Sequence, residues 1–156
     1  MKVIKAKTAG FCFGVKRAVD TVYKQVDTKC GQIYTYGPII HNEEVIKDMR
    51  DKGVIVLRSE EDLDMISQGT VIIRSHGVEK RIYEKIEQKG LRIVDATCPF
   101  VKKIHNIVSE KSGEGFHIII IGNPEHPEVV GIKGWAKDNV TVIQSAEDAE
   151  CFTADR

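Results

Sequence analysis

Residues 91–108, LRIVDATCPFVKKIHNIV, contain the signals of a strand, a short polar loop and a helix in that order. The apolar run at the start is typical of a buried strand, and Pro99 suits the first turn of a helix. Val101 and Ile104 begin an apolar face at helical spacing, so the stretch predicts a β-loop-α unit. Cys98 stands between the two elements, at the expected helix start.

The same order of strand, polar loop and helix recurs along the chain. We expect strands at residues 2–6, 32–36, 54–57, 71–74, 91–94, 116–121 and 140–143. Helix starts are indicated at Asn42, near Asp62 and at Ser145 with Asp148. This alternation predicts an α/β fold, with open, mainly parallel sheets and flanking helices. We expect two α/β units, residues 1–96 and residues 97–156, the second of them incomplete. The segment FHIIII, residues 116–121, is rich in β-branched residues, and we expect it to be a central strand covered on both faces.

Composition limits the class of protein. The chain has 156 residues, of which 42% are hydrophobic, and 23 Lys and Arg balance 23 Asp and Glu, which indicates a globular core. A formal net charge of zero argues against a nucleic-acid partner. The first residues lack the apolar core of a secretory signal, and no apolar run is long enough for a bilayer. We therefore expect a cytoplasmic protein without a membrane partner.

Residues that can do chemistry open the loops that follow the expected strands. In an open α/β sheet the carboxyl ends of the strands face one crevice, where ligands bind. Residues distant in sequence should therefore converge on one site. The candidate residues are Cys12, His41, His76, Cys98, His126 and Glu128.

The two loop cysteines point to a metal. Glycines flank Cys12, and a helix start after each of Cys12 and Cys98 would stabilise a thiolate, the form that binds metals. A reducing compartment also favours metal ligands or reactive thiols over disulfides. An isolated cysteine can instead be a small buried hydrophobe. We interpret Cys30 and Cys151 in that way, as structural residues.

The loop histidines point to an anion. His41, His76 and His126 each follow a strand and precede a helix start, where free backbone N–H groups attract anions and a protonated imidazole would add charge. Together they suggest a phosphate or diphosphate, although any one alone could simply bond to backbone. His105, on a helix, and His117, in a strand, fit core or helix-surface positions better.

Glu128 lies two residues after His126, in the first turn of the helix that Pro127 begins. A carboxylate there can simply complement the helix dipole. In a crevice lined by thiolates, repulsion and desolvation would instead favour its protonated form and make it a proton donor. Both interpretations remain open from local sequence.

Five motifs, in this order, closely resemble one family. AGFCFGVKRAV, GPIIHN, IRSHGV, DATCPFVKKIH and GNPEHPEVVG are similar to the signatures of the 4-hydroxy-3-methylbut-2-enyl diphosphate reductase family, IspH or LytB. The family catalyses the last step of the methylerythritol phosphate route to isoprenoids. The resemblance runs from Lys2 to about Ser145 and covers around the N-terminal half of a family member.

The resemblance implies three α/β domains around a central [4Fe-4S] cluster on three cysteines. Two of these ligands would be Cys12 and Cys98, and the loop histidines would line the pocket for substrate and diphosphate. Glu128 would deliver protons. The implied reaction is reductive removal of the C4 hydroxyl of (E)-4-hydroxy-3-methylbut-2-enyl diphosphate, giving isopentenyl and dimethylallyl diphosphates. Reduced ferredoxin or flavodoxin would be the electron donor.

Part of the family's site has no counterpart in these motifs. The third cysteine, a Ser-x-Asn set for the diphosphate and a threonine would fall beyond Arg156. We therefore expect this chain to be a partial member that lacks the third domain and is inactive alone. Two other classes are kept as alternatives, namely a non-catalytic Cys/His module that binds zinc and an enzyme with a cysteine nucleophile.

Overall fold

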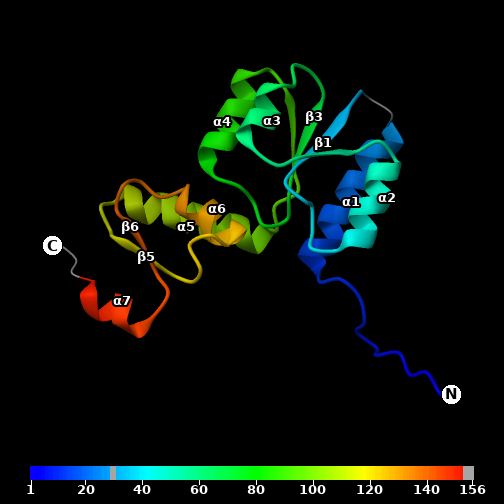
Figure 1. Cartoon of the computed structure of the whole chain (residues 1–156). Coiled ribbons are helices and arrows are strands. Elements are labelled where there is room, and N and C mark those ends of the chain that lie inside the picture. The colour runs from blue at the N-terminus through cyan, green and yellow to red at the C-terminus, as the bar shows by residue number, and fades with distance from the viewer. Residues whose placement is uncertain (29–30, 153–156) are drawn as a thin grey trace.

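A four-stranded parallel sheet forms the first part of the computed structural model, which describes residues 1–28 and 31–152 (Figure 1). Its strands lie in the order β2-β1-β3-β4, so β1 and β3 are central. The bounds are β1 (Ile33–Tyr36), β2 (Ile55–Leu57), β3 (Thr70–Ile73) and β4 (Arg92–Asp95). The chain turns to opposite sides after β1 and after β3, which is the arrangement that opens a crevice at the carboxyl ends of these two strands.

Two pairs of helices cover the two faces of this sheet. They are α1 (Phe13–Thr28) with α2 (Glu43–Asp51), and α3 (Glu60–Asp64) with α4 (Lys80–Gln88). Ile72 of β3 packs in the core formed by α1 and α2. Its neighbours Val71 and Ile73 pack with α3 and α4 on the other face. All three side chains are fully buried, because alternate residues of a central strand meet two helical layers.

A two-stranded parallel sheet, β5 beside β6, forms the second part. Its elements are α5 (Pro99–Gly113), β5 (Ile118–Ile121), α6 (Pro127–Lys133), β6 (Val140–Ile143) and α7 (Ala146–Cys151). Trp135, just after α6, joins this part to the first. Its Nε1 donates to the carbonyl of Val78 at 2.9 Å, and its ring stacks on His105 at 5.1 Å between centroids.

Several local signals act as predicted. Asn42 caps α2, with its Oδ1 accepting from the Val45 N–H at 3.0 Å. Pro99 begins α5, and Ser145 with Asp148 forms a capping box at α7. The α/β class with parallel sheets and flanking helices is confirmed. The division after residue 96 stays a prediction, with one sheet on each side of it.

Three predicted elements need correction. Residues 2–6 form no strand, because no neighbouring strand pairs with them and their side chains are exposed, Val3 by 80%. The segment 116–121 supplies β5, but among residues 1–28 and 31–152 β5 has one neighbouring strand and Ile121 is 83% exposed, so β5 is neither central nor covered on both faces there. Helix α3 begins at Glu60 rather than near Asp62, because the Ser59 side chain caps it.

Two further observations concern the limits of the description. Cys30, predicted to be structural, lies outside the described residues. None of the helices in the described part of the chain combines the length and apolar content that crossing a membrane requires.

Candidate functional site

Three loops at the carboxyl edge of the four-stranded sheet are bonded to one another. The N–H and the Oγ of Ser75, in the loop after β3, both donate to the carbonyl of Ile39, at 3.3 and 3.0 Å. The Cys98 N–H donates in turn to the Ser75 carbonyl at 2.9 Å. Because Ser75 is buried and bonded on both sides, it fixes the loops that carry His41, His76 and Cys98 relative to one another.

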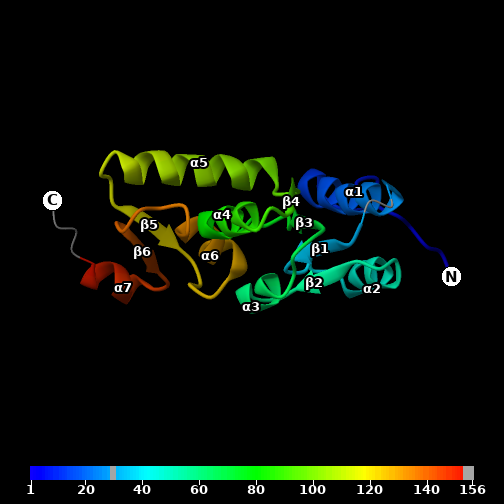
Figure 2. The same cartoon turned by 90° about the horizontal axis from the view of Figure 1, so that it is seen from above.

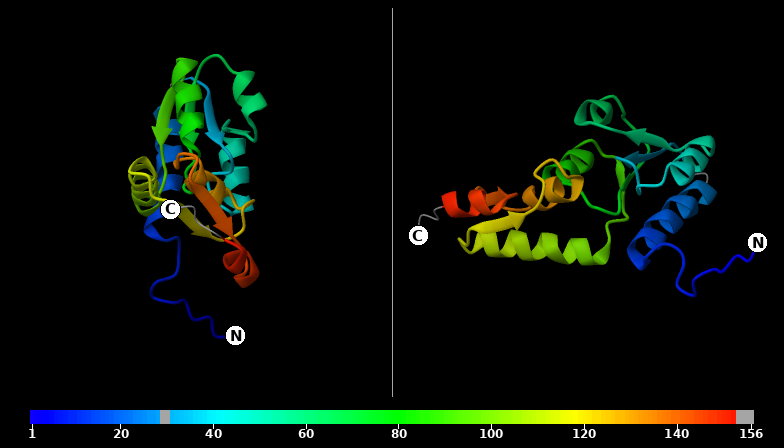
Figure 3. Two further views of the ribbon diagram at one scale, coloured as in Figure 1. Left: turned by 90° about the vertical axis from the view of Figure 1, so that its left-hand side faces the viewer. Right: turned by 60° about the horizontal axis from the view of Figure 1, so that its bottom comes forward.

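The two cysteines lie at adjoining helix ends. Cys98 is the N-cap residue of α5, and the Cys12 carbonyl accepts the first bond of α1, from Lys16 at 2.9 Å. A Cβ on Gly14 would lie only 2.6 Å from the Cys98 Sγ, so α1 comes this close because residue 14 is glycine. Figures 2 and 3 show α1 and α5 meeting end to end beside β4. The start of α1 therefore adjoins the loop of Cys98. That both thiols bind one metal stays a prediction.

Arg17 ties α1 to the loop of Cys98. Its guanidinium donates to the carbonyl of Thr97 at 2.9 Å and to the carbonyl of Asp95 at 3.2 Å. The Asp95 carboxylate is held by the Thr97 N–H at 2.9 Å and by Lys102 at 2.7 Å, and these bonds keep its pKa below the ordinary value although burial opposes them. Arg17 was not among the predicted site residues, because its contacts join segments that are 78 and 80 residues apart in the sequence.

His41 and His76 lie side by side, with ring centroids 4.8 Å apart. Helix α6 packs against the loop of His76, because Gly131 brings its backbone within van der Waals reach of the His76 carbonyl, 3.6 Å from an added Cβ. The charges of Glu128 and His126 also act on His76. His41 and His76 are therefore neighbours, and α6, which His126 caps and which carries Glu128, packs against the loop of His76. The backbone N–H of Cys98 is bonded to the same loop.

Burial lowers the pKa of His76, and the nearby charge of His41 lowers it further, whereas Glu128 acts in the opposite direction. Near neutral pH His76 is therefore a neutral hydrogen-bond donor, and the expected contribution of positive charge from this imidazole is not supported. A bound anion would raise the pKa of His76 again, by the same Coulomb interaction.

His126 has a defined tautomer. It is the N-cap residue of α6, and its Nδ1 accepts a hydrogen bond from the Glu128 N–H at 3.2 Å. A neutral imidazole that accepts at Nδ1 carries its proton on Nε2. His126 therefore presents an N–H donor on the side of the ring away from α6, and Glu128 follows in the first helical turn.

The thiols and imidazoles do not form a complete metal site by themselves. In residues 1–28 and 31–152, no group of three or more His, Cys, Asp or Glu side chains is arranged to hold a metal ion. Nor does either thiol make a hydrogen bond to an imidazole in that part of the chain. Cys12 and Cys98 offer two thiols, a ligand type found in iron–sulfur sites, and the described residues add too few neighbouring ligands for a complete metal site.

The remaining histidines and Cys151 were not predicted to belong to the site. His105 nevertheless packs against the loop of His76, because a Cβ on Gly77 would lie 2.5 Å from its Cε1. His105 is buried, with its Nε2 unpartnered, and burial lowers its pKa to about 4. His117 is bonded to Thr141 at the rim of the second sheet. Their exclusion from the candidate site is consistent with both positions. Cys151 is exposed on α7, so its interpretation as structural stays a prediction.

Comparison with known proteins places these features in a family. The profile of the LytB protein family matches residues 3–156. The chain belongs to the LytB family. A 4-hydroxy-3-methylbut-2-enyl diphosphate reductase of Caldanaerobacter subterraneus is 48% identical over 151 residues, which are 96% of this chain and 52% of that protein. The Thermoanaerobacter sp. reductase of the same name is 50% identical over 151 residues, with the same coverage of 96% and 52%.

Solved structures of LytB family members agree in fold. The Plasmodium falciparum E-1-hydroxy-2-methyl-but-2-enyl-4-diphosphate reductase superposes with a TM-score of 0.88 at 32% identity, over 96% of this chain and 46% of that one. A structure titled as (E)-4-hydroxy-3-methyl-but-2-enyl diphosphate reductase, the terminal enzyme of the non-mevalonate pathway, gives 0.78 at 39% identity, over 94% and 52%. The chain spans about half the length of the LytB relatives it matches.

Proposed function

We propose that this chain carries the first part of the active site of a 4-hydroxy-3-methylbut-2-enyl diphosphate reductase. The observation that carries the proposal is the bonded set of loops that holds His41, His76 and Cys98 at one edge of a parallel sheet, with the start of α1 beside Cys98. The names of relatives that are 48% and 50% identical over 96% of the chain support it.

In this proposal Cys12 and Cys98 bind two irons of a [4Fe-4S] cluster. Both residues begin helices, where the dipole favours a thiolate, and Gly14 keeps the first helix close to the Cys98 Sγ. The cluster would supply electrons to the substrate one at a time. Because the described residues contain no third ligand in place, we further propose that the 156-residue chain alone retains less than one cluster per chain.

The histidines hold the diphosphate and the hydroxyl end of the substrate. His126 offers its Nε2–H, and His76, neutral because burial and His41 lower its pKa, offers an N–H without a net charge. Backbone N–H groups at the start of α2, next to His41, add donors of the same kind. Neutral donors of this type orient an anion without requiring acid pH.

Glu128 is the proton source in the proposed reaction. The C4–O bond of the substrate breaks, and two electrons and two protons convert the substrate to isopentenyl or dimethylallyl diphosphate and water. Glu128 is partly buried in the first turn of α6, beside His126 and near His76, where its carboxyl can pass a proton to the leaving hydroxyl. Reduced ferredoxin or flavodoxin would supply the electrons from the cytoplasm.

The two alternative classes lack support from the geometry of the described residues. A zinc module would need three or four ligands in one place, which this part of the chain does not provide. A cysteine nucleophile would need a base within hydrogen-bond reach, and neither thiol is bonded to an imidazole there.

A chimeric enzyme tests the proposed function. Residues 1–152 would replace the matching half of the Thermoanaerobacter reductase, and turnover would be measured anaerobically with a reduced viologen dye. We expect an active enzyme in which Glu128→Gln lowers turnover by roughly two to four orders of magnitude, the usual scale for a lost general acid. Glu125→Gln, an exposed change in the same loop, is the matched control and should leave turnover unchanged. Equal turnover in both variants would remove the acid role from Glu128.

A further inference from the structure

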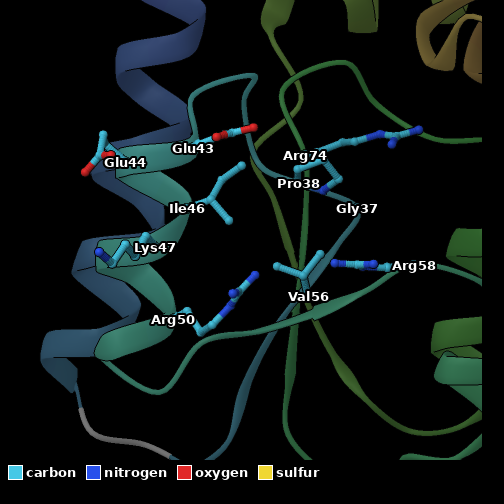
Figure 4. Close-up of a pocket in the computed structure, with 10 residues that line it drawn as sticks. All are labelled: Gly37, Pro38, Glu43, Glu44, Ile46, Lys47, Arg50, Val56, Arg58 and Arg74. Carbon is cyan, nitrogen blue, oxygen red and sulfur yellow. The ribbon is translucent and has the colours of Figure 1, made fainter.

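A cavity of about 570 Å³ lies between the loop after β1, helix α2 and strand β2. Figure 4 shows its lining, to which Arg50, Arg58 and Arg74 all contribute. The proposed active site uses none of these arginines. The concentration of cations in one concave place therefore has no explanation in the function proposed above.

Two of the guanidinium groups converge. Arg50 comes from α2 and Arg58 follows β2, and Figure 4 shows their head groups reaching toward one another across Val56. In the described part of the chain no carboxylate lies within 4.0 Å of either group. Like charges that approach in this way repel, and an anion between them would turn the repulsion into two charge-assisted contacts. Glu43 and Glu44 also line the cavity, but in the described residues neither forms an ion pair with Arg50 or Arg58, and Glu44 projects from α2 away from the pair (Figure 4).

Arg74 closes the side of the cavity nearest the candidate active site. Its side chain lies over Gly37, where an added Cβ would be 2.5 Å from a terminal nitrogen, and its Nε donates to the Gly77 carbonyl at 3.3 Å. Burial lowers the pKa of the Arg74 guanidinium, and no acidic partner compensates for the lost solvation in the described residues. A fixed, poorly solvated cation increases the positive potential at the cavity wall.

The rest of the wall is partly polar and partly apolar. Glu43, Glu44 and Lys47 contribute charged groups, and Pro38, Ile46 and Val56 provide an apolar surface. An inorganic anion alone would leave this surface uncovered, whereas an organic phosphate with a small hydrocarbon part would cover it.

We propose that this cavity is a second binding site, for a phosphate ester with a small apolar group. The phosphate lies between Arg50 and Arg58, which present planar forks suited to phosphate oxygens, and the hydrocarbon lies against Ile46 and Val56. None of the three loop histidines lines this cavity, so the proposed site does not depend on the proposed reductase function.

Calorimetric titration of the 156-residue chain at about 0.15 M salt, an ionic strength that screens weak surface attraction, tests the site. The probes are isopentenyl diphosphate and inorganic pyrophosphate. Arg50→Gln and Arg58→Gln should each weaken the binding of isopentenyl diphosphate by about tenfold or more, the scale of one lost charge-assisted contact. Arg92→Gln, an exposed arginine on β4 outside the cavity, is the matched control and should not weaken it. Equal affinity in all three variants would overturn the site.

Two further readouts locate the ligand. Pyrophosphate should bind more weakly than isopentenyl diphosphate, and equal affinity would overturn the role of the apolar wall. In amide NMR spectra, added ligand should shift the signals of Gly37, Val56 and Arg58. The shifts should saturate, and the dissociation constant they give should equal the calorimetric one. Shifts confined to His76 and His126 would place the ligand at the histidine cluster, which would reject this cavity and leave the proposed function intact.

Discussion

Strands β3 and β5 have almost the same side chains and opposite surroundings. Val71, Ile72 and Ile73 of β3 are fully buried between two layers of helices. In β5 the four isoleucine side chains alternate between partly buried and exposed, and the two exposed ones, Ile119 and Ile121, have exposed fractions of 46% and 83%. The hydrophobicity of a strand therefore does not decide its burial. The number of neighbouring strands and helices decides it, and β3 has strands on both sides whereas β5 has one.

The same difference separates the two halves of the candidate site. The loops of His41, His76 and Cys98 follow strands of the four-stranded sheet or rest on its edge, and Ser75 bonds them together. His126 and Glu128 belong to the two-stranded part and reach the site through α6. A change at the junction of the two parts should therefore displace His126 and Glu128 and leave the loops of the four-stranded sheet in place.

The largest expected effect comes from truncating the same residue type in the two strands. Ile72→Ala should lower the free energy of unfolding by about 2–5 kcal/mol, because it removes a fully buried side chain from the core. Ile121→Ala, at a side chain that is 83% exposed, should change it by less than about 0.5 kcal/mol. Urea unfolding of both variants measures the difference. Similar losses would show that β5 is as well covered as β3.

Acid should weaken the junction through His105, which stacks on Trp135. Burial lowers the pKa of His105 from 6.5 to about 4, so the folded state binds its proton less readily than the unfolded chain. Stability from this residue is thus complete above about pH 6.5 and is lost as the pH falls toward 4, by about 3 kcal/mol in all.

The free energy of unfolding, measured at pH 7 and at pH 4, gives that loss of stability. His105→Gln should show a smaller decrease between the two pH values than the parent chain, because the substituted residue cannot be protonated. His117→Gln, at the exposed histidine of the second sheet, should retain the full decrease. If His105→Gln keeps the pH dependence of the parent chain, the claim that His105 is buried and neutral in the folded state is wrong.

Gly14→Ala tests the approach of α1 to the Cys98 loop. The added methyl would lie 2.6 Å from the Cys98 Sγ, so the helix end must shift, at a cost of about 1–3 kcal/mol of stability. Gly113→Ala is the matched control, because a Cβ there meets nothing within 4 Å and helix propensity then favours alanine. Thermal unfolding of both variants gives the comparison, and a neutral Gly14→Ala would contradict the close contact.

Helix caps provide the smallest expected effect and compare the two parts directly. Asn42→Ala and Ser145→Ala each remove one side-chain cap, at α2 and at α7, and each should cost about 1 kcal/mol. If the two parts unfold together, both variants shift one common transition. Two transitions, each moved by only one of the variants, would show that the parts are independent.

Sequence patterns predicted the structural features that depend on residues close together in the sequence. Helical spacing, the Asn42 and Ser145 caps and Pro99 located α1, α2, α5 and α7, and the position after each strand located the loop residues of the candidate site. The exposure of β5 and the missing strand at residues 2–6 could not be predicted, because both depend on which strands are available as neighbours. The contacts of Arg17 and the cavity at Arg50 depend on packing between distant segments and gave no local signal.

An iron count in cysteine variants of the chimeric enzyme tests the central claim most directly. After anaerobic reconstitution with iron and sulfide, Cys12→Ser and Cys98→Ser should each lose most of the bound iron and its visible absorbance, because each removes one thiolate ligand. Cys151→Ser, at the exposed cysteine of α7, should retain both. Full iron occupancy in either Cys12→Ser or Cys98→Ser would contradict the assignment of the two adjoining helix-end thiols as cluster ligands.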